Sequence, residues 1–343
     1  MALFDHVREL PVTIESVGYE VESVEISPEF ARRTTIVSLA GEGYQGLGED
    51  VTYDSAEHEP DRRARLELAG AWTLESFSEH LDGQDLFPAG EPGQAAYRDY
   101  RRWGYESAAL DLALRQAGLS LAAAIEREAQ PVRFVSSTRA ASLEGWLDLY
   151  PALRFKLDPT ATWTDELVAE IASRGNVDVV DLKGAYHGTV VDNPPDAALY
   201  RRVAEAFPHA WIEDPNFTVE TSAVLAPYLD RVTWDAPVHS WADVEALAHR
   251  PKCLNSKPSR FGSVARLLEF YDRCAEQGIA LYGGGQFELG VGRGQIQLLA
   301  GIFHPDGPND VAPGGYNASS PQPGLETSPL DPRPTETGFR RAD

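Results

Sequence analysis

The chain has 343 residues, of which 43% are hydrophobic and 24% are charged, and its formal net charge is -23. This length suffices for one large domain or two of ordinary size, and the composition is typical of a globular protein. The negative charge argues against nucleic acid and anionic membrane surfaces as partners, because both bind clustered Lys and Arg side chains.

The cellular compartment is predicted from cysteine usage and from the N-terminus. No basic segment followed by an apolar run begins the chain, and no stretch approaches the roughly 18 apolar residues of a membrane span. Cys253 and Cys274 lie in apolar-patterned segments, which predicts buried free thiols and fits a reducing compartment. We therefore expect a cytoplasmic protein that does not associate with membranes.

The first part of the chain has the pattern of a small α+β domain. Residues from about 10 to 55 alternate apolar and polar side chains around a Gly-rich turn, which predicts antiparallel strands. Residues from about 60 to 126 contain RRARLELAGAWTLESFSEHL and ESAALDLALRQAGLSLAAAIE, whose apolar residues have helical spacing. Strands followed by helices predict a domain over residues 1–130.

After residue 130 the pattern changes to repeated βα units. Such units imply parallel strands joined by right-handed crossovers, and eight of them favour a closed TIM-type β/α barrel over residues 131–317. An open doubly wound sheet is the alternative. Residues 318–343 are rich in Pro, Ser and Thr and predict an extension that either packs on the first domain or is disordered. The eight β-rich runs, of which all but the last precede a helical stretch, are VRFVSS, LRFKLD, VDVVDLKG, AWIEDP, VTWDAP, KCLNSKPSRFG, ALYGGGQFE and NDVAP.

Three carboxylates follow apolar runs on successive strands of the predicted barrel, at the strand ends where such barrels have their active sites. They are Asp181, Glu213 and Asp235. Carboxylates this close together need a cation or protons. Oxygen ligands without a nearby His or Cys favour Mg²⁺, with Mn²⁺ as the next choice.

Lysines stand at strand ends of the same barrel, Lys156 and Lys183 at the second and third and Lys257 at the sixth. A lysine close to a metal and to other lysines is expected to have a lowered pKa, so that its neutral amine can act as a base. This combination fits one reaction class. The metal binds the carboxylate of a small substrate, the base removes the α-proton, and the metal stabilises the resulting enediolate.

Several segments resemble the enolase superfamily, specifically its muconate-lactonizing-enzyme-like branch (the mandelate racemase/muconate lactonizing enzyme family). This resemblance implies an N-terminal capping domain on a barrel, metal ligation by Asp181, Glu213 and Asp235, and an acid/base or cationic role for Lys257. It also implies that capping loops around Tyr19 and Thr52 cover the substrate. The resembling segments, in chain order, are TTIVSLAGEGYQGLGEDVTY, SAALDLALRQAGLSL, WIEDP, VTWDAP, NSKPSRFGSV and GGGQFELGVGRGQIQLLA. Further candidates for substrate contacts at the sixth and seventh strand ends are Arg260, Gln286 and Glu288.

Two strand ends depart from the family pattern. Lys156-Leu157-Asp158 stands where Lys-x-Lys is usual, and Asp181-Leu182-Lys183 stands where Asp-x-Asn is usual. In one interpretation Lys183 takes over the missing lysine's role. In a second, Lys156 is the reactive lysine, and in a third, Asp158 is the acid/base or an extra ligand. A different alignment, which reads KLDPTATW as the Asp-x-Asn element, would make Asp158 the first metal ligand.

The sequence thus predicts an Mg²⁺-dependent lyase or isomerase that acts by β-elimination (dehydration) or cycloisomerisation. Racemisation or epimerisation is the alternative reaction, and it needs an acid/base group on each face of the substrate. A relative that has lost catalysis and serves as a binding or structural protein is the alternative of another class. The substrate is not predicted by the sequence, and a homo-oligomer is compatible with it.

Overall fold

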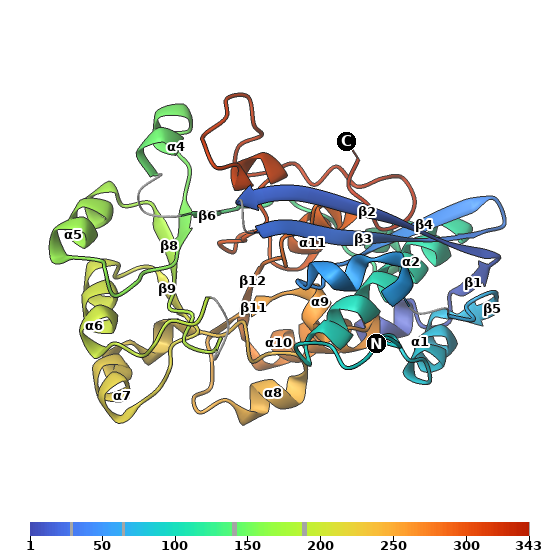
Figure 1. The fold of residues 1–343 in the computed structure, drawn as a ribbon, viewed down its shortest axis with the longest axis horizontal. Coiled ribbons are helices and arrows are strands. Elements are labelled where there is room, and N and C mark those ends of the chain that lie inside the picture. Colours follow the sequence, from blue (N-terminus) through green and yellow to red (C-terminus); the bar gives the residue numbers. More distant parts are fainter. Residues whose placement is uncertain (28–29, 64–65, 139–142, 187–190, 343) are drawn as a thin grey trace.

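The computed structural model describes residues 1–27, 30–63, 66–138, 143–186 and 191–342. Figure 1 shows the N-terminal strands and helices, in blue and teal, beside a set of strands with helices around them, in green to red. Among the described residues, no helix combines the length and the apolar character that crossing a membrane requires.

The capping part is built on a three-stranded antiparallel sheet. Its strands are β2 (Ser16–Ser27), β3 (Phe30–Gly41) and β4 (Tyr44–Asp50), which pair in chain order. The long helix α2 (Tyr97–Gln116) packs directly on β4. This contact requires glycines, because a Cβ atom at Gly46 would lie 2.2 Å from the Ala108 carbonyl oxygen.

One predicted helix in the cap is wrong in its first half. Helical spacing predicted a helix through most of residues 62 to 81, but Gly70–Thr73 form strand β5, which pairs with β1 (Pro11–Ile14). The helix α1 (Leu74–Asp82) begins only after Thr73, whose hydroxyl accepts a bond from the Ser76 N–H as an N-cap. Pairing with a strand distant in sequence thus overrides the local helical spacing. The remaining short elements of the cap are η1 (Leu3–His6), η2 (Ser55–His58), η3 (Pro60–Arg62) and α3 (Leu121–Ala124).

The second part consists of repeated strand–helix units, as predicted. Valine-rich strands with both faces covered are typical of parallel sheets enclosed by helices. Helix boundaries follow local chemistry: Thr164 caps the start of α5, and Gly175, in the left-handed conformation (φ 69°), ends it. The elements in chain order are β6 (Ser136–Thr138), α4 (Leu143–Leu149), β7 (Phe155–Leu157), α5 (Asp165–Arg174), β8 (Val177–Asp181), α6 (Ala197–Ala206), β9 (Trp211–Glu213), α7 (Val219–Leu225), η5 (Ala226–Arg231), β10 (Val232–Thr233), α8 (Trp241–Ala246), β11 (Cys253–Ser256), α9 (Pro258–Phe261), α10 (Val264–Gln277), β12 (Ala280–Gly283), α11 (Val291–Phe303) and η6 (Gly314–Asn317).

The strands follow one another in the order of a barrel, as two parallel sheets that isolated contacts link to each other. The strands β6 to β10 form one parallel sheet, and β11 and β12 form another. The eighth β-rich segment appears as isolated bridges, and these connect the second sheet back to the beginning of the first. The joining contacts are the hydrogen bond from Asn255 N–H to the Trp234 carbonyl (3.0 Å) and the parallel pairs Gly284–Asp310 and Phe134–Asn309.

The cap and the barrel share one hydrophobic core. A single cluster of buried side chains includes Leu112 of α2, Phe270 of α10 and Leu298 of α11. A second cluster fills the space between the strands and helices α4 to α7. Because the first cluster crosses the boundary between the two parts, we expect them to unfold together.

The C-terminal segment packs along the surface of both parts. Leu330 forms an antiparallel bridge with Val132 at the start of the barrel. Phe339 is buried against Trp103 of α2, with ring centroids 6.5 Å apart, and its N–H donates to the Asp111 carboxylate at 2.7 Å. Among the described residues, the extension therefore has the contacts of a packed segment.

We predict that Phe339→Ala lowers the free energy of unfolding by about 3–5 kcal/mol, because it removes a fully buried aromatic ring that ties the C-terminal segment to the cap. Urea denaturation, followed by both fluorescence and circular dichroism, measures this loss. Val219→Ala, at an exposed position, is the control and should change stability by less than about 0.5 kcal/mol. Separate transitions for the two parts would contradict the shared core.

Candidate metal and acid/base site

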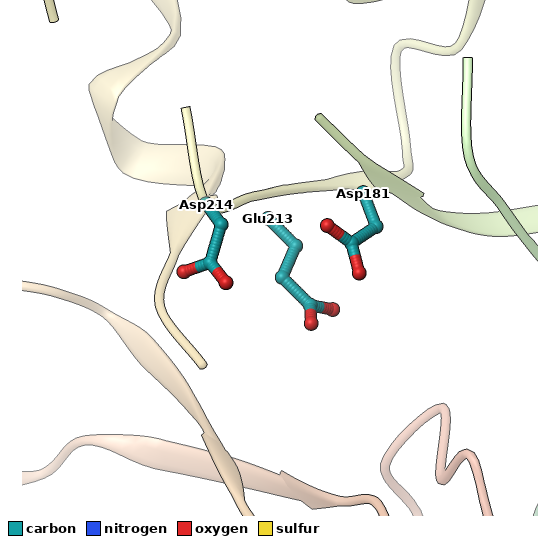
Figure 2. Close-up of side chains that lie close together, drawn as sticks. All are labelled: Asp181, Glu213 and Asp214. Carbon is teal, nitrogen blue, oxygen red and sulfur yellow. The ribbon is translucent and has the colours of Figure 1, made fainter. Parts of the chain in front are cut away.

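The barrel brings three buried carboxylates together at adjacent strand ends. Asp181 ends β8 and Glu213 ends β9, and the two are paired in the parallel register. Asp214 follows directly, and one oxygen from each of the three residues lies within 4.8 Å of the others. Figure 2 shows these side chains next to one another. Parallel register therefore places the predicted first and second ligands side by side.

The proximity of these groups changes their protonation. Burial raises the pKa of Glu213 to about 8, and the neighbouring Asp181 carboxylate contributes to the rise. Burial likewise raises the pKa of Asp214 to about 7, with other carboxylates adding to the effect. Asp181 behaves differently: burial opposes its ionisation, but two neighbouring lysines outweigh burial and lower its pKa to about 2. At Glu213 and Asp214 burial and neighbouring carboxylates thus outweigh the nearby positive charge, whereas at Asp181 the positive charge outweighs burial.

Lys156 lies inside this cluster. Its Nζ is 2.6 Å from Glu213 Oε1 and 3.1 Å from Asp181 Oδ2, and its side chain is only 1% exposed. Burial disfavours its charge, but the two carboxylates outweigh burial and raise its pKa well above the usual range. Lys156 is therefore enclosed between the two carboxylates as their counter-charge in this structure.

Lys183 reaches the same cluster from the side of the solvent. Its ammonium contacts Asp181 Oδ2 and lies 3.7 Å from Asp158 Oδ1. The Lys183 side chain is 17% exposed and that of Asp158 is 46% exposed. Asp181 and Asp158 raise the Lys183 pKa despite burial, which is opposite to the lowered lysine pKa expected from the sequence. A cation bound by Asp181 would compete for that carboxylate and weaken this effect.

Asp235 faces cationic groups on the other side of the cluster. Its Oδ2 is 2.7 Å from Lys257 Nζ and accepts a hydrogen bond from Tyr186 OH at 3.0 Å. Burial opposes ionisation of Asp235, but Arg260 and Lys257 outweigh it and lower the Asp235 pKa far below its usual value. Lys183 and Lys257 therefore approach the carboxylates from opposite ends of the row.

The donor set fits a hard divalent cation. Carboxylate oxygens dominate it. Buried Asp235 Oδ1 accepts no hydrogen bond within the described part of the chain, although Arg260 Nε lies 3.1 Å from it as an ion-pair partner. Asp181 and Glu213 would supply two of the ligands. Two residues are candidates for the third ligand. Asp235 is the one that the sequence predicted, and Asp214 is the one whose carboxylate lies close to those of Asp181 and Glu213. Both oxygens of Asp214 already accept backbone N–H groups, from Asp235 and Ala236 at 2.9 Å, so Asp214 orients the Asp235 backbone.

The predicted substrate contacts divide into two groups. Gln286 and Glu288 lie at the end of β12, where the Gln286 N–H donates to Glu288 Oε1 at 2.7 Å, and Arg260 lies beside Asp235. Thr52 is buried, and its hydroxyl donates to Asp50. Tyr19 contacts Tyr105 through their hydroxyls at 3.2 Å, inside the cap. The burial of Thr52 argues against a direct substrate contact by its side chain, whereas Tyr19 is only partly buried and its contact stays a prediction.

Three residues that the sequence reasoning did not single out, Tyr282, Asn255 and Tyr186, contact the predicted ligands. Tyr282 OH donates to Glu213 Oε2 at 2.7 Å, and Asn255 Nδ2 donates to Glu213 Oε1 at 3.2 Å. Tyr186 reaches Asp235 from the loop after β8. Asp214 stands beside Glu213 at the fourth strand end in the sequence but was not among the predicted ligands. The available signals were the polar Asn255 within a buried strand and the acidic pair in WIEDP, whereas nothing local marks Tyr186.

Two family models together match most of the chain. Residues 5–124 match the N-terminal domain, and residues 128–318 match the C-terminal domain, of a family described as domain of unknown function DUF8230. The chain belongs to the DUF8230 family. Over 69 residues, this DUF8230 protein is 35% identical to o-succinylbenzoate synthase from Bacillus subtilis (strain 168), a match that covers 20% of this chain and 17% of that protein.

Solved structures share the fold of this DUF8230 protein. Dipeptide epimerase from Methylococcus capsulatus, complexed with Mg ion, aligns with a TM-score of 0.69 and 17% identity over 96% of this chain and 100% of that one. Muconate cycloisomerase from Pseudomonas fluorescens aligns with a TM-score of 0.63 and 19% identity over 88% and 87% of the two chains. These likenesses confirm the predicted fold of a capped β/α barrel. One of the structures with this fold, from Enterococcus faecalis, is itself described as an unknown member of the enolase superfamily.

We predict that the DUF8230 protein binds Mg²⁺ with micromolar to millimolar affinity and that Glu213→Gln abolishes this binding. Protons and metal compete for the same carboxylates, and Glu213 has a pKa of about 8, so affinity should increase as the pH rises from about 6 to about 9. Isothermal titration calorimetry at several pH values measures both effects.

Glu205→Gln, an exposed substitution of the same kind, should leave Mg²⁺ affinity unchanged. Binding that persists in Glu213→Gln would place the metal elsewhere.

Proposed function

We propose that this protein is an Mg²⁺-dependent enzyme that removes the proton α to the carboxylate of a small substrate. One observation carries the proposal: Lys183 and Lys257 reach a row of buried carboxylates from its two ends, through Asp181 and Asp235 respectively. A row of carboxylates supports a metal, and an amine at each end supports proton transfer.

The metal and the lysines would have separate tasks. Asp181, Glu213 and Asp235 are the proposed ligands, and bound Mg²⁺ would supply a Lewis acid for the substrate carboxylate and for charge that develops on it. Lys257 is the proposed acid/base or cationic group on one side. Lys156 and Asn255 hold Glu213 in place, since both donate to its Oε1.

Lys183 is the proposed second acid/base group. Three alternatives followed from the altered strand ends, and exposure favours Lys183 over Lys156, because the latter is enclosed between two carboxylates. Asp158 contacts the ammonium of Lys183 from the more exposed side, so we assign it the task of orienting Lys183. In this arrangement the lysine missing from the second strand is replaced by one from the third.

The leading candidate reactions are β-elimination, meaning dehydration, and cycloisomerisation. The local match to a protein named o-succinylbenzoate synthase supports a lyase, and the fold shared with a muconate cycloisomerase is compatible with cyclisation. Epimerisation is the second candidate, because it needs an acid/base group on each side of the α-carbon and two lysines are available. A cytoplasmic location and a homo-oligomer remain predictions from the sequence.

We predict that Lys257→Met and Lys183→Met each slow exchange of the substrate α-proton with deuterated solvent by roughly 10²–10⁴-fold. Proton NMR across a panel of small carboxylic acids, with Mg²⁺ present, measures the exchange. An epimerase would also interconvert the two enantiomers, whereas a lyase would form an alkene.

Lys252→Met removes a lysine from the surface and is the matched control, for which we expect full activity. Exchange that survives both site substitutions would exclude these lysines as the base. Mg²⁺ binding without exchange of any tested acid would favour the non-catalytic relative.

A further inference from the structure

Arg32 of the cap is a fully buried cation with an unusual set of partners. Its guanidinium donates to four backbone carbonyls at distances between 2.7 and 3.2 Å. A hydrogen bond from a charged donor to a carbonyl oxygen is stronger than one from a neutral donor. The four hydrogen bonds together offset the free-energy cost of burying the guanidinium charge. The four acceptors are the carbonyls of Val51, Thr52, Gln286 and Phe287.

These carbonyls belong to two segments far apart in the sequence. Val51 and Thr52 follow β4 in the cap, while Gln286 and Phe287 follow β12 in the barrel. Phe287 has a left-handed backbone (φ 57°), which is unfavourable for a side chain of this type and persists only where surrounding contacts hold it. Arg32 supplies such contacts, because it binds the carbonyls on both sides of the Phe287 Cα atom.

The barrel segment carries a side chain that faces the proposed site. We orient the Gln286 amide with its oxygen toward donors, where it accepts from Tyr100 OH at 3.1 Å and from the Arg260 guanidinium at 3.2 Å. Arg260 in turn contacts Asp235. A continuous chain of contacts therefore leads from Arg32 through Gln286 to the carboxylate row.

Two further contacts link the same regions. The Arg32 guanidinium lies over the Tyr53 ring, 4.3 Å from its centroid, and so also places a partly exposed aromatic side chain of the cap. The carboxylate of Glu49, at the end of β4, accepts the N–H groups of Leu289 (2.7 Å) and Gly292 (2.8 Å) at the start of α11. Cap residues thus hold the segment after β12 at both of its ends.

We propose that Arg32 is a positioning residue that sets the location of Gln286 and Tyr53 at the mouth of the barrel and so defines the shape of the substrate pocket. The importance of Arg32 for catalysis rests on the proposed function. Its effect on the positions of the segments after β4 and after β12 does not. Arg32 touches neither the carboxylate row nor the lysines directly, and it acts through the backbone that it binds.

The test is hydrogen–deuterium exchange on the full chain, comparing wild type with Arg32→Met. We expect roughly ten- to a hundredfold faster exchange in peptides covering 50–53 and 284–292, which is the effect of losing charged hydrogen bonds, and no change in α5 and α6. Guanidinium chloride at about 20 mM should restore protection in Arg32→Ala, because the free cation can occupy the same four carbonyls. Arg33→Met, the adjacent arginine on an outward position, is the matched control.

Mg²⁺ affinity should stay unchanged in Arg32→Met, because the proposed ligands lie on β8, β9 and after β10. Unchanged exchange in 284–292, or a uniform increase along the whole chain without guanidinium rescue, would overturn the proposal. If Arg32→Met does not fold, Arg32→Lys decides the question: it retains charge with fewer donors and should show an intermediate, regional loss of protection. Failure of the proposed enzyme function would appear separately, as absent Mg²⁺ binding and absent α-proton exchange.

Discussion

Burial of like charges at the strand ends is the constraint on which the site depends. Asp181, Glu213, Asp214 and Asp235 are all enclosed, and water cannot screen their repulsion. The structure compensates them from several directions: Lys156 between two carboxylates, backbone N–H groups on Asp214, and cations beside Asp235. The raised pKa of Glu213 shows that this compensation is incomplete. A divalent cation is the addition that such a donor set accommodates.

The same electrostatic demand gives a physical reason for the altered strand ends. A lysine at the end of the third strand contacts Asp181, and an aspartate at the end of the second strand lies beside that lysine. Relative to the family pattern, the positive charge has moved to the neighbouring strand and an acid has taken its former place. Asp181 thus has a lysine from its own strand end beside it, although the Lys-x-Lys motif is absent.

The cap takes part in the site through fixed contacts. Arg101 of α2 pairs with Asp50 at 2.9 Å and with Glu57 at 3.3 Å in the interior of the cap. Asp50 also accepts the Thr52 N–H at 3.0 Å. The segment expected to close over a substrate is therefore held by buried charges. Because the hydrophobic core crosses from cap to barrel, the two parts are packed against each other through that core.

The sequence alone determined the βα repeat, the row of carboxylates on successive strands and the lysines near them, because these follow from periodicity and from strand ends that share one edge. It did not determine β5, because the residues of β5 have helical spacing but form a strand that pairs with β1. It also did not determine the burial of Lys156 and Thr52. It also gave no indication of the role of Arg32, which donates hydrogen bonds to carbonyls more than two hundred residues apart in the chain. Local pattern specifies which element a residue belongs to, whereas the partner of a long polar side chain depends on which distant backbone the fold brings within hydrogen-bond reach.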